Sequence, residues 1–132
     1  MIKPNCPPKV VLVEDDPEQL NELTGYFQHF GWAVRPALDA FVGLDAICEV
    51  RPTLAVVQAA LPGISGARLA EIATMLDPKV QIILISDDEP DGQDCASASL
   101  YPLAVLKRPI DLDELGAIAQ TVATPQRFAL SA

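Results

Sequence analysis

Short apolar segments alternate with longer amphipathic ones along most of the chain. A short, almost continuous apolar run bounded by polar, Gly or Pro residues is typical of a β-strand that is buried on both faces. Five such runs occur, at Lys9–Val13, Trp32–Pro36, Thr53–Val57, Val80–Ile85 and Leu103–Leu106. The pattern therefore predicts five buried strands.

The segments between the first three runs carry apolar residues at helical spacing. Pro17 suits the first turn of a helix, and Gly31 suits its end. The apolar positions of this helix are Leu20, Leu23, Phe27 and Phe30. Asp39 can cap a second helix, which Arg51-Pro52 ends. Its apolar positions are Phe41, Leu44, Ile47 and Cys48.

Three further helices are predicted, with unequal support. One follows the loop Leu61–Gly66 and ends at Asp77-Pro78. Its apolar positions are Leu69, Ile72, Ala73 and Leu76. The segment Ser86–Leu100 is rich in Asp, Ser and Gly, so its helix has the weakest pattern. Pro109–Val122 forms a last amphipathic helix, which Asp111 starts.

Alternation of strands and helices predicts an α/β fold. Near-continuous apolar strands belong to a parallel sheet with helices on both faces. Right-handed crossovers then favour a flavodoxin-like, doubly wound, five-stranded sheet with strand order 2-1-3-4-5. In such sheets, functional residues lie at the carboxyl ends of the strands.

Composition limits the function classes. The chain has 132 residues, which fits one domain, and 50% of them are apolar, which is enough for a core. A net charge of -9, with no basic cluster larger than Lys107-Arg108, argues against binding to nucleic acid or to an anionic membrane surface. The N-terminal residues do not resemble a signal peptide, and no apolar run is long enough to span a bilayer.

Cysteine and histidine usage points to the cytoplasm. The three cysteines, Cys6, Cys48 and Cys95, are widely spaced and form no C-x-x-C pair. Reduced thiols fit a cytoplasmic protein better than a disulfide framework or a zinc site. His29 is the only histidine, so a site with several histidine ligands is excluded.

Polar groups follow four of the predicted strands at the edge where functional residues are expected. They are Glu14-Asp15-Asp16, Gln58, Ser86-Asp87-Asp88 and Lys107-Arg108-Pro109. Neighbouring carboxylates repel one another unless a cation neutralises them, and oxygen ligands of this kind suit Mg²⁺. The alternative is structural, with Asp16 capping the first helix and the other carboxylates solvated.

Four segments in register carry a family resemblance. They are V-L-V-E-D-D-P, L-P-G-I-S-G, I-L-I-S and R-P-I-D-L-D-E-L. Together they resemble the receiver domain of bacterial two-component response regulators. The resemblance covers residues 9–122 and leaves residues 1–8 as an N-terminal extension and residues 123–132 as a tail or a linker stub.

The resemblance implies a phosphoryl-transfer site with roles for particular residues. Glu14 and Asp15 match the acidic pair that binds Mg²⁺, and Ser86 matches the hydroxyl residue that contacts the phosphoryl group. The position of the aspartate that a histidine kinase phosphorylates is Gln58. The position of the lysine before the proline is Arg108. The aromatic position on the fifth strand is Val105.

These departures predict a degenerate receiver, or pseudo-receiver. A neutral amide at Gln58 cannot form the acyl phosphate, which needs a carboxylate nucleophile. Only Glu14, Asp15 and the Ala60 carbonyl would remain for Mg²⁺, so we expect weak or absent binding. Arg108 can pair with Asp15, through both arms of its guanidinium, and would compete further with the metal.

Several alternatives stay open at this stage. Lys107 replaces Arg108 as the functional base if the fifth strand has a one-residue bulge. Gln58 could be an engineered replacement for the aspartate. Asp87 and Asp88 could add a cation ligand, although a solvated loop fits them better. The pocket could also belong to a metal- or small-ligand-binding sensor.

The function expected from the resemblance is that of a protein-interaction module, not of an enzyme. A haloacid-type phosphatase would need a D-x-D motif after the first strand, which Glu14-Asp15-Asp16 does not supply. A flavin site would need a phosphate-binding loop there. The expected partner is a histidine kinase, a phosphotransfer protein or an output domain, or a second copy that binds through residues 92–122.

Overall fold

The computed structural model describes residues 7–87 and 104–123. Its strands are β1 (Lys9–Val13), β2 (Ala33–Ala37), β3 (Leu54–Gln58), β4 (Gln81–Ser86) and β5 (Ala104–Lys107). Its helices are α1 (Pro17–His29), α2 (Ala40–Val50), α3 (Gly66–Leu76) and α4 (Leu112–Ala123). The predicted helix at Ser86–Leu100 lies almost entirely outside the described residues.

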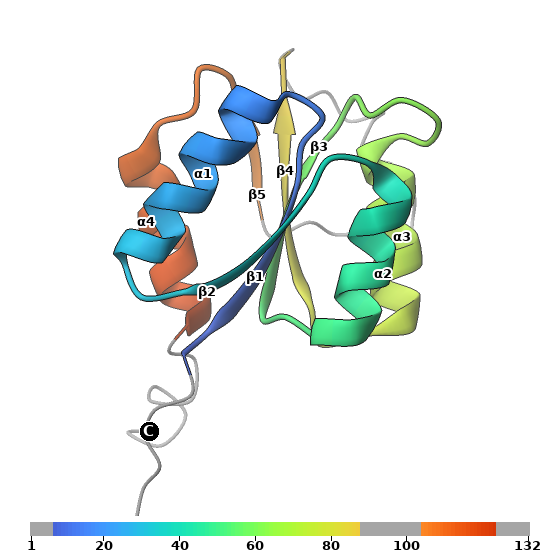
Figure 1. Ribbon diagram of the computed structural model, residues 1–132, viewed down its shortest axis with the longest axis horizontal. Helices are drawn as coiled ribbons and strands as arrows, with labels where there is room; N and C mark the ends of the chain where they lie inside the picture. Colours follow the sequence, from blue (N-terminus) through green and yellow to red (C-terminus); the bar gives the residue numbers. More distant parts are fainter. Residues whose placement is uncertain (1–6, 88–103, 124–132) are drawn as a thin grey trace, which may run out of the picture.

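The five strands form one parallel sheet in the order β2-β1-β3-β4-β5, which confirms the predicted fold and topology (Figure 1). The predicted bounds of β1 are correct, whereas each of the other four strands begins and ends one residue later than predicted. The polar residues Gln58, Ser86 and Lys107 continue the sheet, because Gln58 pairs with Ile85 and Ser86 pairs with Lys107. Strand pairing, not side-chain polarity, sets these ends.

Helices cover both faces of the sheet. Helices α1 and α4 lie on one face, and α2 and α3 lie on the other (Figure 1). Two apolar cores result. One joins α1 and α4 to the sheet through residues such as Leu12, Phe27 and Leu115, and the other joins α2 and α3 to it through residues such as Val11 and Leu69. This arrangement leaves the carboxyl edge of the sheet open between the helix layers.

Capping residues begin the helices largely as predicted. Asp16 accepts a hydrogen bond from the Glu18 N–H, and Asp39 accepts one from the Val42 N–H. Asp111 also accepts hydrogen bonds in the first turn of α4, so that helix begins at Leu112 rather than at Pro109. It continues to Ala123, one residue into the predicted tail.

The predicted apolar face of α2 is correct for Ile47 and Leu44, which contact the core, and wrong for Phe41 and Cys48. Phe41 is 72% exposed and Cys48 is also exposed, whereas the buried positions are Ala40, Gly43, Ala46 and Ile47. A Cβ atom at Gly43 would lie 2.6 Å from a methyl group of Val13. Three small residues therefore face the sheet together with Ile47, because the helix backbone lies close to it, and Phe41 turns outward.

The same error affects single residues of the other helices. Phe30 and Leu76, both predicted as apolar contacts, are 61% and 49% exposed.

No helix within residues 7–87 and 104–123 is long and apolar enough to cross a membrane.

Candidate functional site at the carboxyl edge of the sheet

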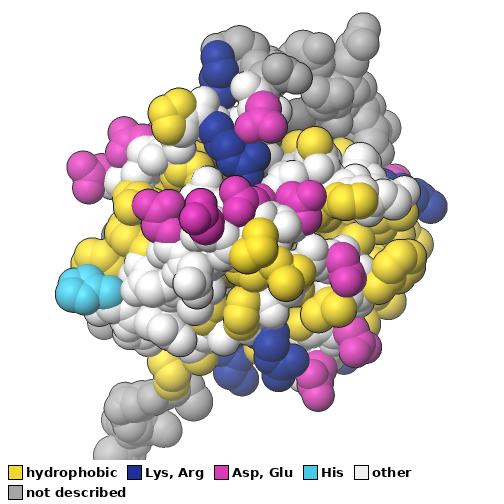
Figure 2. Space-filling model, turned by 45° about the horizontal axis from the view of Figure 1, so that its top comes forward, with side chains coloured by type: hydrophobic (Ala, Val, Ile, Leu, Met, Phe, Trp, Pro, Cys, Tyr) yellow, Lys and Arg dark blue, Asp and Glu magenta, His cyan; other side chains and the backbone are white. Residues whose placement is uncertain are grey.

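Three polar side chains meet where β1, β3 and β5 end. They are Glu14, Gln58 and Arg108, which lie far apart in the sequence and come together because their strands are parallel. Figure 2 turns this edge toward the viewer and shows acidic side chains gathered on it beside a few basic ones. The sheet topology therefore brings together three of the predicted edge residues, Glu14, Gln58 and Arg108.

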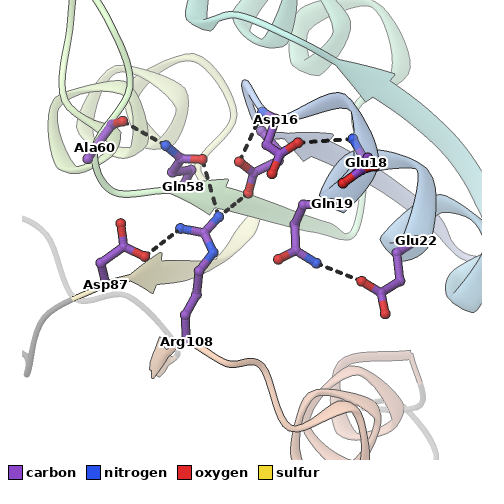
Figure 3. A network of polar contacts seen from close by, with 9 residues as sticks. Asp16, Glu18, Gln19, Glu22, Gln58, Ala60, Asp87 and Arg108 are labelled. Atoms are coloured by element: carbon purple, nitrogen blue, oxygen red, sulfur yellow. Dashed lines mark hydrogen bonds and ion pairs between the residues drawn. The ribbon is translucent and has the colours of Figure 1, made fainter.

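Arg108 is the centre of this cluster. Its Nη2 atom donates hydrogen bonds to Oε1 of Glu14 and, over 3.2 Å, to Oε1 of Gln58. Its Nη1 atom donates to Oδ1 of Asp87 over 3.0 Å. The Arg108 side chain is only 21% exposed, and Figure 3 shows its guanidinium group between Gln58 and Asp87. The planar group thus joins residues at the carboxyl ends of β1, β3 and β4.

Gln58 uses both ends of its amide. Its Oε1 atom accepts from Arg108, and its Nε2 atom donates to the Ala60 carbonyl over 2.7 Å (Figure 3). The side chain is almost fully buried, with 8% of the residue exposed. An ionised carboxylate has no hydrogen to donate to the Ala60 carbonyl. The amide therefore fits this arrangement, and an aspartate would leave the carbonyl without its partner.

Glu14 is a buried carboxylate held by two donors. The residue is 2% exposed, and its oxygens accept hydrogen bonds from Arg108 and from the Asp16 N–H. Burial raises the pKa of Glu14 above its ordinary value of 4.5, and the charge of Asp15 adds to this effect. The Asp16 N–H and the Arg108 guanidinium act in the opposite direction without cancelling it.

The predicted ion pair between Arg108 and Asp15 is wrong, since Arg108 pairs with Glu14 and Asp87. The backbone explains the difference. The Glu14 N–H donates to the Ala37 carbonyl over 3.1 Å, which continues the pairing of β1 with β2 by one residue. Glu14 is therefore buried at the strand end, and the Asp15 side chain that follows is exposed.

The fifth strand has no bulge. Pairing between β4 and β5 is continuous from Ile83 with Ala104 to Ser86 with Lys107, and the Arg108 N–H then donates to the Ser86 carbonyl. Arg108 is the residue that contacts Glu14 and Gln58, while Lys107 is exposed. The alternative in which a bulge gives Lys107 the role of Arg108 therefore has no support in the pairing.

The loop after β3 fixes the position of Gln58. The Gly66 N–H donates to the Ala59 carbonyl over 2.7 Å. A Cβ atom at Gly66 would collide with the Gln58 carbonyl oxygen. The Ser65 hydroxyl caps α3 by accepting a hydrogen bond from the Arg68 N–H, and the helix begins at the next residue, Gly66. The close approach at Gly66 holds the backbone of β3 and its last side chain in place.

The residues at this edge do not fit the Mg²⁺ that the family resemblance implies. Of the three expected ligands, Glu14 already binds a guanidinium group, and the Ala60 carbonyl already accepts from Gln58. Within the described residues, no group of three or more His, Cys, Asp or Glu side chains could hold a metal ion. Asp15 alone would remain, and one carboxylate is a poor site for a cation that strongly retains its water.

Sequence reasoning named Asp87 and the Ala60 carbonyl at this edge but missed the contacts that each of them makes. Asp87 was expected in a solvated loop, but it pairs with Arg108 while its side chain stays 65% exposed. The Ala60 carbonyl was expected to face a metal, but it binds the Gln58 amide. The amide at position 58 could have indicated the contact with Ala60, because the N–H₂ group of a buried amide needs a hydrogen-bond acceptor nearby.

Comparisons with known proteins agree with this fold. A family model described as "Response regulator receiver domain" matches residues 10–120. A CheY-like receiver domain protein from Methanospirillum hungatei is 24% identical, with a TM-score of 0.81 over 89% of this chain and 94% of that chain. The signal receiver domain of an HD domain-containing protein from Pseudomonas fluorescens is 23% identical, with a TM-score of 0.83 over 92% of this chain and 98% of that chain.

A receiver domain protein from Clostridium thermocellum is 15% identical, with a TM-score of 0.82 over 92% of this chain and 98% of that chain. Because these structures are less than 25% identical to this chain, they show its fold alone. The family is shown by the family model, which matches most of the chain. The search of curated proteins found no match.

Proposed function

This chain belongs to the response regulator receiver domain family, and we propose that it acts in two-component signalling without being switched by phosphorylation. The observation that carries the proposal is the network around Arg108, in which Gln58 occupies the position of the family's phosphorylated aspartate. In this view the chain is a pseudo-receiver, and it presents one fixed surface to its partner.

Loss of the nucleophile is the first support. Acyl phosphate formation requires a carboxylate oxygen to attack phosphorus, and the lone pair on an amide nitrogen is delocalised into its carbonyl. Both polar atoms of the Gln58 side chain are also engaged, with Ala60 and Arg108. The residue is therefore unsuited to the reaction both chemically and in its position.

The positive charge of Arg108 is the second argument for the proposal. The Arg108 guanidinium lies against the Glu14 carboxylate, at the edge where the family resemblance implies a metal ion. Phosphorylation of a receiver would need this charge to move aside for both the metal and the phosphoryl group. Since Arg108 binds three side chains at once, that movement would break several charge-assisted hydrogen bonds.

Protein binding is the activity that remains for such a module. We propose a partner from the signalling machinery, namely a histidine kinase, a phosphotransfer protein or an output domain. A second copy of this chain is the other candidate partner, and the surface between residues 92 and 122 would serve either. Of this surface, residues 104–122 are described, and they include β5 and nearly all of α4. We also propose that the chain has no catalytic activity and that it is located in the cytoplasm.

Incubation with acetyl phosphate and Mg²⁺, followed by intact-mass measurement, tests the proposal. The wild-type chain should gain no phosphoryl group. Gln58→Asp alone should react poorly, because Arg108 would pair with the new carboxylate. The double variant Gln58→Asp/Arg108→Lys should react, and this would show that the fold itself is competent. An alkali-labile phosphoryl adduct on the wild-type chain would overturn the proposal.

A further inference from the structure

A half-open pocket of about 270 Å³ lies between α1 and α4, and it shares no lining residue with the Arg108 network. Tyr26, Phe27, Phe30 and Trp32 form one wall. The opposite wall comes from α4 and includes the Asp113 carboxylate. Phe27 and Trp32 are buried core residues that form the floor of the pocket, whereas Phe30 is exposed at its edge, and the proposed signalling role does not account for this exposed ring.

The four rings form a curved wall rather than a flat stack. Phe27 packs edge-on against both Tyr26 and Trp32, with ring centroids 5.7 and 5.4 Å apart. Tyr26 and Phe30 are tilted, with their centroids 5.0 Å apart. Phe30 is 61% exposed, so this ring is available at the pocket mouth. Aromatic faces carry partial negative charge, so the exposed Phe30 ring beside Tyr26 can attract a cation.

Two contacts fix Tyr26 in this wall. Its hydroxyl donates to the Leu112 carbonyl over 2.9 Å. The ring can approach α4 because residue 116 is glycine, where a Cβ atom would collide with the tyrosine hydroxyl. The pocket is therefore held open by the packing of the two helices and does not need a ligand to shape it.

Negative charge also lies at the pocket. Asp113 is exposed in the first turn of α4. Asp113 and Tyr26 both line the pocket, and burial, with the Asp113 charge adding to it, raises the pKa of Tyr26. Neither lysine nor arginine lines the pocket. The combination of aromatic faces and a carboxylate would repel an anion and would favour a positively charged guest.

We propose that this pocket binds a small organic cation, an alkylammonium or guanidinium compound, with its charged group against the aromatic wall and near Asp113. The proposal goes beyond the signalling role and rests on a different part of the molecule. Phosphorylation of Gln58→Asp variants and cation binding at this pocket can therefore fail independently.

Titration with choline and with agmatine tests the proposal on the full chain. Trp32 is the only tryptophan, so its emission reports on this pocket alone, and calorimetry gives an independent affinity. We expect saturable binding of at least one of the two cations. We expect the neutral analogue of choline, 3,3-dimethylbutan-1-ol, to bind at least about tenfold more weakly, because it lacks the charge.

Variants locate the site. Phe30→Ala should weaken binding by about two- to thirtyfold, which is the range for one cation–aromatic contact, and Asp113→Asn should weaken it as well. Both residues are exposed, so both variants should fold, and their melting temperatures check this. Phe41→Ala, which removes an exposed ring from α2, outside the pocket, should leave the affinity unchanged.

Three results would overturn the proposal. They are equal affinity for choline and its neutral analogue, unchanged affinity in Phe30→Ala and Asp113→Asn, and the absence of saturable binding at millimolar choline and agmatine. Binding of an arginine-centred peptide in place of both free cations would overturn the assignment to a small molecule.

Discussion

The Arg108→Met variant removes the guanidinium group but keeps a long apolar side chain in its place. Glu14 would then remain 2% exposed without its cation, although the Asp16 N–H would still bind it. The free energy of unfolding should fall, because a buried carboxylate without a counter-charge is costly. The same change frees Asp87, which can regain water because its side chain is 65% exposed.

The structure sets the size of this effect. Removing one partner of a buried ion pair typically costs about 3–5 kcal/mol. Glu14 can escape part of this cost by taking up a proton. Relative to an ordinary pKa of 4.5, protonation at pH 7 costs about 3.4 kcal/mol, at about 1.36 kcal/mol per pH unit. Because Arg108 is also 21% exposed, we expect a loss of about 2–3 kcal/mol at pH 7.

The loss should shrink on acidification. The pKa of Glu14 is higher in the folded chain than in the unfolded chain. Protonation of Glu14 therefore adds to the free energy of unfolding in full below the unfolded pKa, and this contribution is lost as the pH rises through the folded pKa. Without Arg108 the folded pKa rises further, and the loss extends toward neutral pH. At pH 5 protonation costs only about 0.7 kcal/mol, which becomes the upper limit on the charge penalty.

Urea unfolding followed by circular dichroism, at pH 7 and at pH 5, measures these differences against the wild-type chain. Glu14→Gln/Arg108→Met should recover much of the stability that Arg108→Met loses at pH 7, since no buried charge remains. Asp87→Asn is the matched control and should cost less than about 1 kcal/mol, because its ion pair is exposed. An equal loss at both pH values, or an Arg108→Met chain as stable as wild type at pH 7, would refute this reasoning.

Three other predictions concern the loop, a helix cap and the metal. Gly66→Ala should lower stability clearly, because its Cβ would collide with the Gln58 carbonyl oxygen, whereas Gly25→Ala, in open space on α1, should raise it by about 0.5–1 kcal/mol in urea unfolding. Ser65→Ala should cost about 0.5–2 kcal/mol in the same assay, because the Arg68 N–H loses its acceptor. Calorimetric titration of the wild-type chain with Mg²⁺ should show no binding in the micromolar range, and such binding would contradict the role given to the guanidinium group.

Much of the fold could be predicted because its determinants are local. Uninterrupted apolar runs identify strands that are buried on both faces, and Asp16, Asp39 and Asp111 sit where helices need an acceptor for their first N–H groups. The order of the strands followed from the handedness of the crossovers. The one-residue shift of four strands did not follow, because pairing with a neighbour decides where a strand ends.

Close packing was beyond the sequence pattern. On α2 the helical spacing of large apolar residues suggested that Phe41 is buried, whereas the small residue Gly43 faces the sheet. Hydrophobicity alone does not distinguish these cases, since the distance between helix and sheet decides which side chain fits.

The members of the site were predicted better than their contacts. Gln58 and Arg108 were identified from their positions after β3 and β5, and the structure places them together. The carboxylate that pairs with Arg108 was not identified correctly, because Glu14 and Asp15 are adjacent and chemically alike. Only the continuation of the sheet beyond Val13 decides which of these two carboxylates is buried.

The central claim is that the amide and the guanidinium group together prevent phosphoryl chemistry at this edge. Fluorine NMR of the chain with beryllofluoride and Mg²⁺ tests it most directly, because bound fluoride has its own resonances. We expect none for the wild-type chain, and we expect them to appear for Gln58→Asp/Arg108→Lys. Saturable protein-bound resonances in the wild-type chain, lost on removal of Mg²⁺, would contradict the claim.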